Sequence, residues 1–313
     1  MDSLGLYLIS LLTMGGIYAV LALGLNIQWG MTGLMNAGVA GFVAIGAYTT
    51  AILTTAPSGM HLGGFGWPVW AGMLAATLAS GLLALPIALI CIRLRSDYLA
   101  MATLGIAEIL RLVVRNEEWA TGGPRGVAGL PKPFTDLAAP YDQLAYLGMV
   151  LALIALVYWL AERAYRAPWG RVQRAIRENE VAAAAAGKNV EAFRLQSFVL
   201  GAMVMGLGGS LLAHNIRFIG PEAVEPLIAT FLVWVMLIAG GSGNNRGAIL
   251  GAFAIWSLWA VTEIATAQLP PELGGRAAYV RVFLIGLALQ LILLYRPQGL
   301  IGEKPPRPLS RID

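Results

Sequence analysis

The chain has 313 residues, of which 58% are hydrophobic and 12% are charged. Soluble domains carry about 25% charged residues, whereas here apolar runs of about the 20 residues needed to cross a bilayer recur along the sequence. This composition excludes an ordinary soluble domain. It predicts an all-α, polytopic membrane helical bundle with about nine (8–10) transmembrane helices.

The remaining composition argues against metal, disulfide and nucleic-acid chemistry. The single Cys91 excludes an internal disulfide framework and a cysteine-based metal cluster. His61 and His214 have no paired-ligand spacing, so no metal site is expected. The pI of about 9.3 would suggest nucleic acid in a soluble chain. Here the basic residues flank apolar runs, so membrane lipid and orientation explain them and no nucleic-acid partner is expected.

In chain order, the first apolar run covers residues 4–25. It lacks a basic n-region and exceeds the length of a signal-peptide core, which predicts a retained first span. Asn26–Ala37 is too polar for a lipid-facing span. We interpret it as a short interfacial or re-entrant piece, which leaves open whether the chain has a tenth crossing. The later predicted spans are 38–55, 68–91, 97–114, 143–161, 197–216, 227–241, 247–267 and 279–295.

The basic residues predict the orientation of these spans. If the C-terminal tail is inside, the inside loops hold most of the 21 Lys and Arg residues: Arg93, Arg95, Arg163, Arg166, Arg171, Arg174, Arg177, Lys188, Arg194, Arg246, Arg296, Lys304, Arg307 and Arg311. The outside loops hold Glu117, Glu118, Asp136, Asp142, Glu222, Glu225 and Glu272. The positive-inside rule therefore favours an outside N-terminus and a cytoplasmic C-terminus.

Small residues are frequent in the predicted spans. The stretches Gly38–Tyr48, Leu207–Ala213 and Ala239–Phe253 contain small residues four apart. Such residues let helix backbones approach closely where lipid gives no hydrophobic drive for association. Helix packing is therefore their expected role.

The charged stretch Arg174–Gln196, "RAIRENEVAAAAAGKNVEAFRLQ", interrupts the apolar pattern. Strong helix formers lead to an alanine run that stops at Gly187, and a second helical run follows. Because glycine is favoured just past a helix C-terminus, the pattern predicts a helix, a turn at Gly187 and a helix entering the next span. A solvated connector between two spans, with its basic residues on the cytoplasmic side, would explain this stretch. A loop with its own secondary structure also favours a coupling element that a soluble partner grips.

Several polar residues lie at membrane depth, where they usually face a bundle interior or a water path. Arg111 lies one turn after Glu108, so the two are expected to pair, either as a structural ion pair near the outer helix end or as part of a path or gate. The same alternatives, with helix–helix hydrogen bonding favoured, hold for Asn26, Asn36, Tyr48 and Asn215. Thr121–Gly129, "TGGPRGVAG", predicts a turn-rich outer loop that is either an ordered connection or a docking surface for a delivering protein.

Five ordered stretches resemble the branched-chain amino acid permeases of ABC importers. They are the charged stretch above, Gly24–Leu53, Arg95–Asn116, Thr121–Gly129 and "RPQGLIG" at Arg296–Gly302, and "YLAMATLG" before "TGGPRG" is typical of the M-type subunit. The resemblance implies the ABC importer permease fold, with residues 1–313 as one transmembrane domain in the bacterial cytoplasmic membrane. It also implies a cytoplasmic coupling loop at about 164–196 and a short cytoplasmic tail at 297–313.

The resemblance also implies partners and functional residues. They are a second, H-type permease subunit, two ATPase subunits, and a periplasmic or lipid-anchored binding protein. The residues that match the ATPase-docking motif are Arg177, Glu178, Glu180, Ala183, Ala184 and Gly187. The permease helix after this motif would start at 189–194.

The expected function is therefore that of a transporter subunit without cofactor, not of an enzyme. The only Gly-Lys pair, Gly187-Lys188, lacks the other residues of a Walker A loop, so ATP hydrolysis is expected on partner subunits. Leucine, isoleucine and valine are the expected substrates, with other amino acids, urea or short amides as the alternative. A self-sufficient secondary transporter is a less favoured class, and a membrane-embedded enzyme has no supporting constellation of residues.

Overall fold

The computed structural model describes residues 3–58, 61–94, 96–267 and 277–303. Most of the predicted tail, including Lys304, Arg307 and Arg311, lies outside the described residues, as do Glu272 and Arg95. The described chain is almost entirely helical, which confirms the predicted class.

Each predicted span falls on a helix. The helices are α1 (Ser3–Leu25), α2 (Val39–Thr54), α3 (Val69–Cys91), α4 (Ser96–Asn116), α6 (Tyr141–Arg166), α9 (Val190–Ile216), α10 (Leu232–Gly240), α11 (Asn245–Ala267) and α12 (Ala277–Tyr295). Within the described ranges, α3, α6, α9, α11 and α1 with its extension to Gly30 are long and apolar enough to cross a membrane, and three shorter helices are apolar. The chain is thus a multi-pass membrane protein, while nine crossings stay a prediction.

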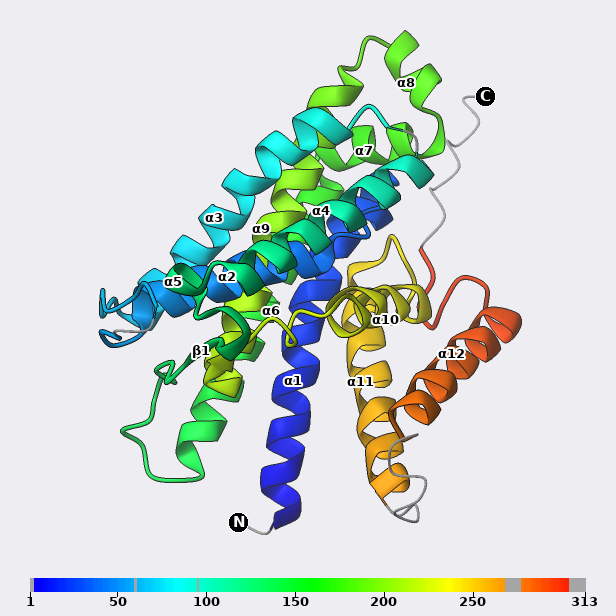
Figure 1. Cartoon of the computed structure of the whole chain (residues 1–313). Coiled ribbons are helices and arrows are strands. Elements are labelled where there is room, and N and C mark those ends of the chain that lie inside the picture. The colour runs from blue at the N-terminus through cyan, green and yellow to red at the C-terminus, as the bar shows by residue number, and fades with distance from the viewer. Residues whose placement is uncertain (1–2, 59–60, 95, 268–276, 304–313) are drawn as a thin grey trace.

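The bundle is organised around α9 and α1. The helix α9 packs against α2, α3 and α1, and α1 also packs against α11 and α6. Large side chains such as Phe198, Met205 and Leu211 are fully buried along α9. Figure 1 places the N-terminus at one end of the molecule and the short helices α7 (Pro168–Glu178) and α8 (Glu180–Ala185) at the opposite end.

Several glycines of the predicted spans are packing residues at helix crossings. A Cβ on Gly46 of α2 would lie 2.1 Å from the carbonyl oxygen of Gly206 in α9. A Cβ on Gly209 would lie 2.2 Å from the carbonyl oxygen of Val43. These distances show that α2 and α9 touch backbone to backbone, as the small-residue pattern predicted.

Replacing Gly46 by alanine should therefore destabilise the protein. The added methyl meets rigid backbone rather than a flexible side chain, so the free energy of unfolding should fall by about 1–3 kcal/mol. Thermal unfolding in detergent measures the effect. Gly148→Ala is the matched control, because no atom lies within 4 Å of a Cβ there and alanine favours helix. An equal midpoint for G46A and G148A would contradict the packing role.

The polar stretch after the first span lies in the protein interior. Asn26–Gly30 continues α1 as a π-helix, and Asn26, Gln28 and Asn36 are completely buried. Residues 26–32 thus extend α1, and the non-helical residues 33–38 connect this extension to α2. Neighbouring protein groups, not lipid or water, satisfy these polar side chains.

The connection between α4 and α6 carries β1 (Val127–Ala128), one of the two short strands in the described ranges. The strand β1 pairs antiparallel with β2 (Phe218–Ile219), directly after α9. Before β1 come α5 (Glu118–Thr121) and a 3-10 turn at Gly123–Arg125. The predicted turn-rich loop is thus confirmed, and β2 ties it to the end of α9.

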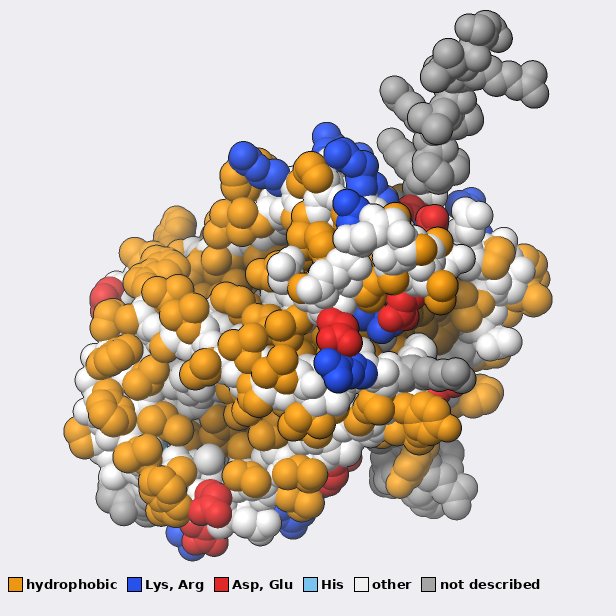
Figure 2. Space-filling view, turned by 90° about the horizontal axis from the view of Figure 1, so that it is seen from above, with side chains coloured by type: hydrophobic (Ala, Val, Ile, Leu, Met, Phe, Trp, Pro, Cys, Tyr) orange, Lys and Arg blue, Asp and Glu red, His pale blue; other side chains and the backbone are white. Residues whose placement is uncertain are grey.

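Hydrophobic side chains cover most of the molecular surface. Figure 2 shows them across the whole view, with charged side chains gathered in a few clusters. Exposed examples are Leu82 and Ile90 on α3 and Leu294 on α12. In water such a surface would aggregate, whereas it matches a bilayer.

Candidate coupling segment and buried polar network

The coupling segment, defined here as residues 168–189, folds as two short helices and a turn. It was predicted as one helix ending before Gly187, but the structure divides it at Asn179 into α7 and α8. Asn179 is extended (φ −154°, ψ 98°), and its Oδ1 accepts a hydrogen bond from the backbone N–H of Ala182 at 2.9 Å. The helix divides there because an asparagine cap satisfies the first N–H groups of α8.

The predicted turn at Gly187 is confirmed. Gly187 has φ +76°, and its N–H donates to the carbonyl of Ala184 at 2.9 Å. The N–H of Lys188 donates to the carbonyl of Ala183 at 3.2 Å, which completes a Schellman motif. The next helix begins at Val190, where Asn189 caps it, within the expected start at 189–194.

The two short helices are fixed against the base of α9. Ile176, Ala183 and Val190 form a small buried cluster. The Gln173 amide donates to the carbonyl of Phe193 at 2.9 Å. An ion pair of 3.0 Å joins Arg194 of α9 to Glu180 of α8. The segment is thus a rigid hairpin rather than a loose connector.

The six residues matched to the docking motif divide into two groups. Glu178, Glu180, Ala184 and Gly187 are exposed and available to a partner, and Val181 between them is 78% exposed. Ala183 and Arg177 instead turn inward. Ala183 and Arg177 thus brace the coupling segment against the rest of the protein.

Arg177 connects the coupling segment to the first span. Its guanidinium donates to the carbonyl oxygen of Gly30, at the end of the π-helix, and to Oε2 of Glu303 at 2.7 Å. Sequence reasoning missed Glu303. Its only signal is its position directly after the "RPQGLIG" stretch.

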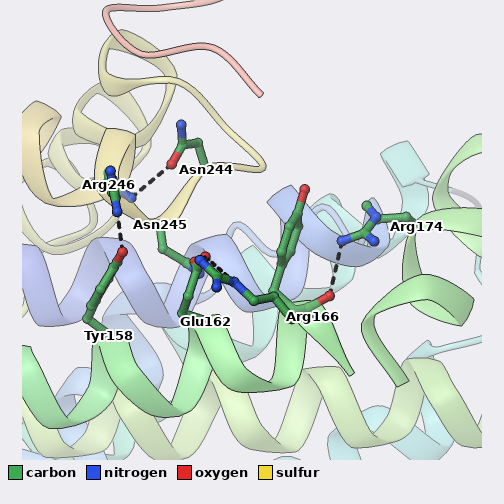
Figure 3. A network of polar contacts seen from close by, with 8 residues as sticks. Tyr158, Glu162, Arg166, Arg174, Asn244, Asn245 and Arg246 are labelled. Atoms are coloured by element: carbon green, nitrogen blue, oxygen red, sulfur yellow. Dashed lines mark hydrogen bonds and ion pairs between the residues drawn. The ribbon is translucent and has the colours of Figure 1, made fainter. Parts of the chain in front are cut away.

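A buried polar network continues from this point into the bundle. Asn26 donates to Oδ1 of Asn245 at 2.9 Å and accepts from the N–H of Gly243 at 2.9 Å. Asn245 in turn donates to Glu162 at 3.1 Å, and Arg166 pairs with the same carboxylate. Figure 3 shows these side chains of α6 and α11 facing one another, with Arg246 bonded to the Tyr158 hydroxyl beside them.

Asn36 belongs to a second buried cluster. Its amide donates to Oε1 of Gln28 at 2.7 Å, and Gln28 donates to the carbonyl of Phe198 at 2.7 Å. Asn36 Oδ1 accepts from the N–H of Gly38 at 2.7 Å. Asn26 thus joins the α1 extension to α11, whereas Asn36, outside the helices, bonds to Gln28 and to Gly38 nearby in the chain.

The contacts of Asn26 predict that its loss weakens the fold. Asn26→Ala would leave the Gly243 N–H and an Asn245 oxygen buried without partners, which should lower the free energy of unfolding by about 1–3 kcal/mol. Thermal unfolding measures this loss of stability. The control is Gln196→Ala, which removes an exposed amide side chain. A variant that unfolds like the wild type but no longer transports would instead make Asn26 a path residue.

Tyr48 and Asn215 are placed differently. The Tyr48 hydroxyl is buried and has no hydrogen-bond partner among the described residues. Asn215 contacts Met14 Sδ at 3.1 Å and lines a cavity of about 350 Å³ with Thr13 and Lys132. Neither side chain therefore shows the bracing seen at Asn26.

The C-terminal end of α9 is anchored by a histidine that sequence reasoning left without a role. His214 is completely buried; its Nε2 lies 2.8 Å from the Thr50 hydroxyl and its Nδ1 lies 2.7 Å from the carbonyl of Pro131. Because the carbonyl only accepts, Nδ1 carries the proton and Nε2 accepts from Thr50. His214 therefore ties α2 and the outer loop to α9.

The helix α4 has one buried face and one open face. Leu99, Thr103, Ala107 and Val114 are buried, whereas Met101 and Ile109 are about 60% exposed. The expected ion pair is present beside the open face: Arg111 Nε donates to Glu108 Oε2 at 2.9 Å. The carboxylate and guanidinium side chains are 40% and 23% exposed. On the predicted span 97–114, such a partly exposed charge pair would face a protein partner or a water path rather than lipid.

The described residues contain no group of three His, Cys, Asp or Glu side chains that could hold a metal ion. The described residues form an apolar helical bundle with the rigid, exposed coupling segment at one end. The Glu108–Arg111 ion pair lies beside the open face of α4. These features define a multi-pass helical membrane protein.

Comparison with known proteins specifies the class. Residues 7–293 match the family described as the permease component of the branched-chain amino acid transport system. The chain belongs to this family, whose members are transport permeases rather than enzymes. No solved structure matches it.

Individual relatives agree with the family assignment. The chain is 33% identical to the high-affinity branched-chain amino acid transport system permease protein LivM of Escherichia coli, over 98% of this chain and 72% of that protein. It is 28% identical to a probable LivM of Methanocaldococcus jannaschii, over 93% and 92% of the two chains. A more distant relative is the autoinducer 2 import system permease protein LsrC of Yersinia pseudotuberculosis, at 26% identity over 65% of this chain and 54% of that protein.

Proposed function

We propose that the chain is the transmembrane permease subunit of an ATP-driven importer and forms part of the path for branched-chain amino acids delivered by a binding protein. The observation that carries this proposal is the coupling segment, a rigid hairpin with one exposed face. Four of the six docking-motif residues lie on that face. An exposed, internally braced hairpin suits a partner that pushes on it.

The proposed partners follow from the described surfaces. Two ATPase subunits dock on the two permease subunits from the cytoplasm, and one of them contacts the coupling segment of this chain. The N-terminus then lies outside and the C-terminus inside, as the distribution of basic residues favours. Residues 1–313 act as one permease domain, with the coupling loop and the tail as its cytoplasmic parts.

The open face of α4 is the proposed contact with a second, H-type permease subunit. There Glu108 and Arg111 line the path or gate between the two subunits. Asn215 and Tyr48 are proposed as further path residues, because neither is braced by the buried networks. Alternating access then consists of rigid-body tilting of the helices around this seam, driven through the coupling segment.

The outer loop is the proposed contact for the binding protein. It lies on the side of the molecule away from α8 (Figure 1). Its turn Gly122–Gly126 borders a cavity of about 420 Å³ that includes Arg125 and Glu118. Anchoring of this loop by β2 and His214 would transmit binding-protein contact to α9.

The substrate class rests on the family and on the LivM relatives, whose names specify branched-chain amino acids. Other amino acids, urea or short amides are the alternative. The relative that imports autoinducer 2 shows that similar permeases serve chemically different cargo. Ligand-affinity measurements on the cognate binding protein decide between these substrates.

Reconstitution tests the whole proposal. Proteoliposomes with this chain, the second permease subunit and the ATPases should accumulate radiolabelled leucine only with binding protein outside and ATP inside. Liposomes with this chain alone are the control. Uptake by the lone chain on a proton or sodium gradient would instead establish a secondary transporter.

A further inference from the structure

The segment that follows α12 is fastened to the turn between α10 and α11. The N–H groups of Leu300 and Ile301 donate to the carbonyls of Ala239 and Gly240 at 2.8 and 2.9 Å. The Asn244 amide donates to the carbonyl of Gly302 at 3.0 Å. These bonds fix the backbone immediately before Glu303.

Glu303 uses both carboxylate oxygens toward other helices. Oε1 accepts a hydrogen bond from the Tyr165 hydroxyl of α6 at 2.9 Å, and Oε2 accepts from the Arg177 guanidinium of α7 at 2.7 Å. The Arg177 and Glu303 side chains are only 24% and 25% exposed. Such a partly buried, charge-assisted contact holds its geometry better than a surface ion pair does.

Three parts of the chain meet tightly at this contact. Arg177 also donates to the Gly30 carbonyl at the end of the α1 extension. A Cβ on Gly243 would lie 2.9 Å from both Arg177 Nη1 and Glu303 Oε2, so this glycine leaves the space for the pair. The covalent link from α6 to α7 is, by contrast, the single extended residue Ala167.

We propose that Glu303 is a positioning residue for energy coupling. It clamps α7 to α1, α6 and the α10–α11 turn, so that a displacement of the coupling segment moves these helices as one body. Without the clamp, α7 keeps its contacts with α9 but loses its tie to α6 and the α10–α11 turn, so the displacement is not transmitted to those helices. This inference rests on the proposed function, because it requires a partner that moves the coupling segment.

The test uses the complete reconstituted importer with Glu303→Gln. Glutamine keeps an acceptor for Tyr165 but removes the charge that holds Arg177. The ATPases should still co-purify and hydrolyse ATP, while uptake per ATP hydrolysed should fall about fivefold, the low end for coupling between two sites. Glu191→Gln is the matched control, since Glu191 pairs with Arg93 in an exposed ion pair on α9 and touches none of the clamp.

Tyr165→Phe supplies a second variant that changes neither charge nor fold. It removes one hydrogen bond to Glu303 and should lower the same ratio about twofold. Ratios equal to the wild type in E303Q and Y165F would overturn the inference and leave the permease proposal intact. If E303Q does not assemble, Y165F decides alone, with the same two outcomes. An importer whose wild-type chain binds no ATPase would instead refute the proposed function.

Discussion

Valine in place of Gly187 should lower substrate uptake about tenfold, with loss of ATPase co-purification. Gly187 has φ +76°, where a β-branched side chain costs about 1–2 kcal/mol or more, equivalent to about a tenfold change in an equilibrium. The turn would relieve this strain by opening the hydrogen bond from Lys188 to Ala183. The α8 surface would then lose its orientation toward α9.

Gly187→Asn provides the control, because asparagine tolerates the left-handed conformation and no atom lies within 4 Å of a Cβ at this position. It should retain most of the uptake. Equal and undiminished uptake by both variants, with the ATPases still bound, would remove the coupling role from this segment.

Replacing Glu108 alone by leucine should disrupt assembly with the second permease subunit. The change leaves the Arg111 guanidinium without its carboxylate on a membrane helix, and removing one partner of such a pair costs about 3–5 kcal/mol when it is buried. The pair becomes buried if the open face of α4 is covered in the complex. The yield of the purified heterodimer measures this effect.

The double variant Glu108→Leu/Arg111→Leu separates structure from transport. Removal of both charges leaves an apolar face, so assembly should recover. If the pair lines the path, uptake should stay about fivefold or more below the wild type, within the usual range for lost coupling. Recovery of uptake together with assembly would make the pair purely structural.

Much of the bundle was predictable because length and hydropathy determine where a membrane helix forms. All nine predicted windows fall on helices, since a lipid environment leaves the backbone no other way to satisfy its hydrogen bonds. Polarity alone did not determine the surroundings of Asn26–Ala37. Whether an asparagine faces lipid, water or another amide depends on partners such as Asn245, which lies more than two hundred residues away in sequence.

Only the local features of the coupling segment could be predicted, because its other contacts depend on residues distant in sequence. The turn at Gly187 follows from local rules, because glycine alone adopts its φ freely. The inward orientation of Arg177 does not, since it depends on the Gly30 carbonyl and on Glu303 from the far end of the chain. Likewise, nothing local to His214 marks it as the link between α2 and the outer loop.

Labelling of a thiol on α8 tests the central claim most directly. Val181 is 78% exposed, and Val181→Cys in a Cys91→Ser background gives a single reactive thiol. A membrane-impermeant maleimide should leave it unmodified in intact cells, label it after permeabilisation, and label it far less when the ATPase subunits are present. Modification in intact cells would place the coupling segment outside and contradict the entire account.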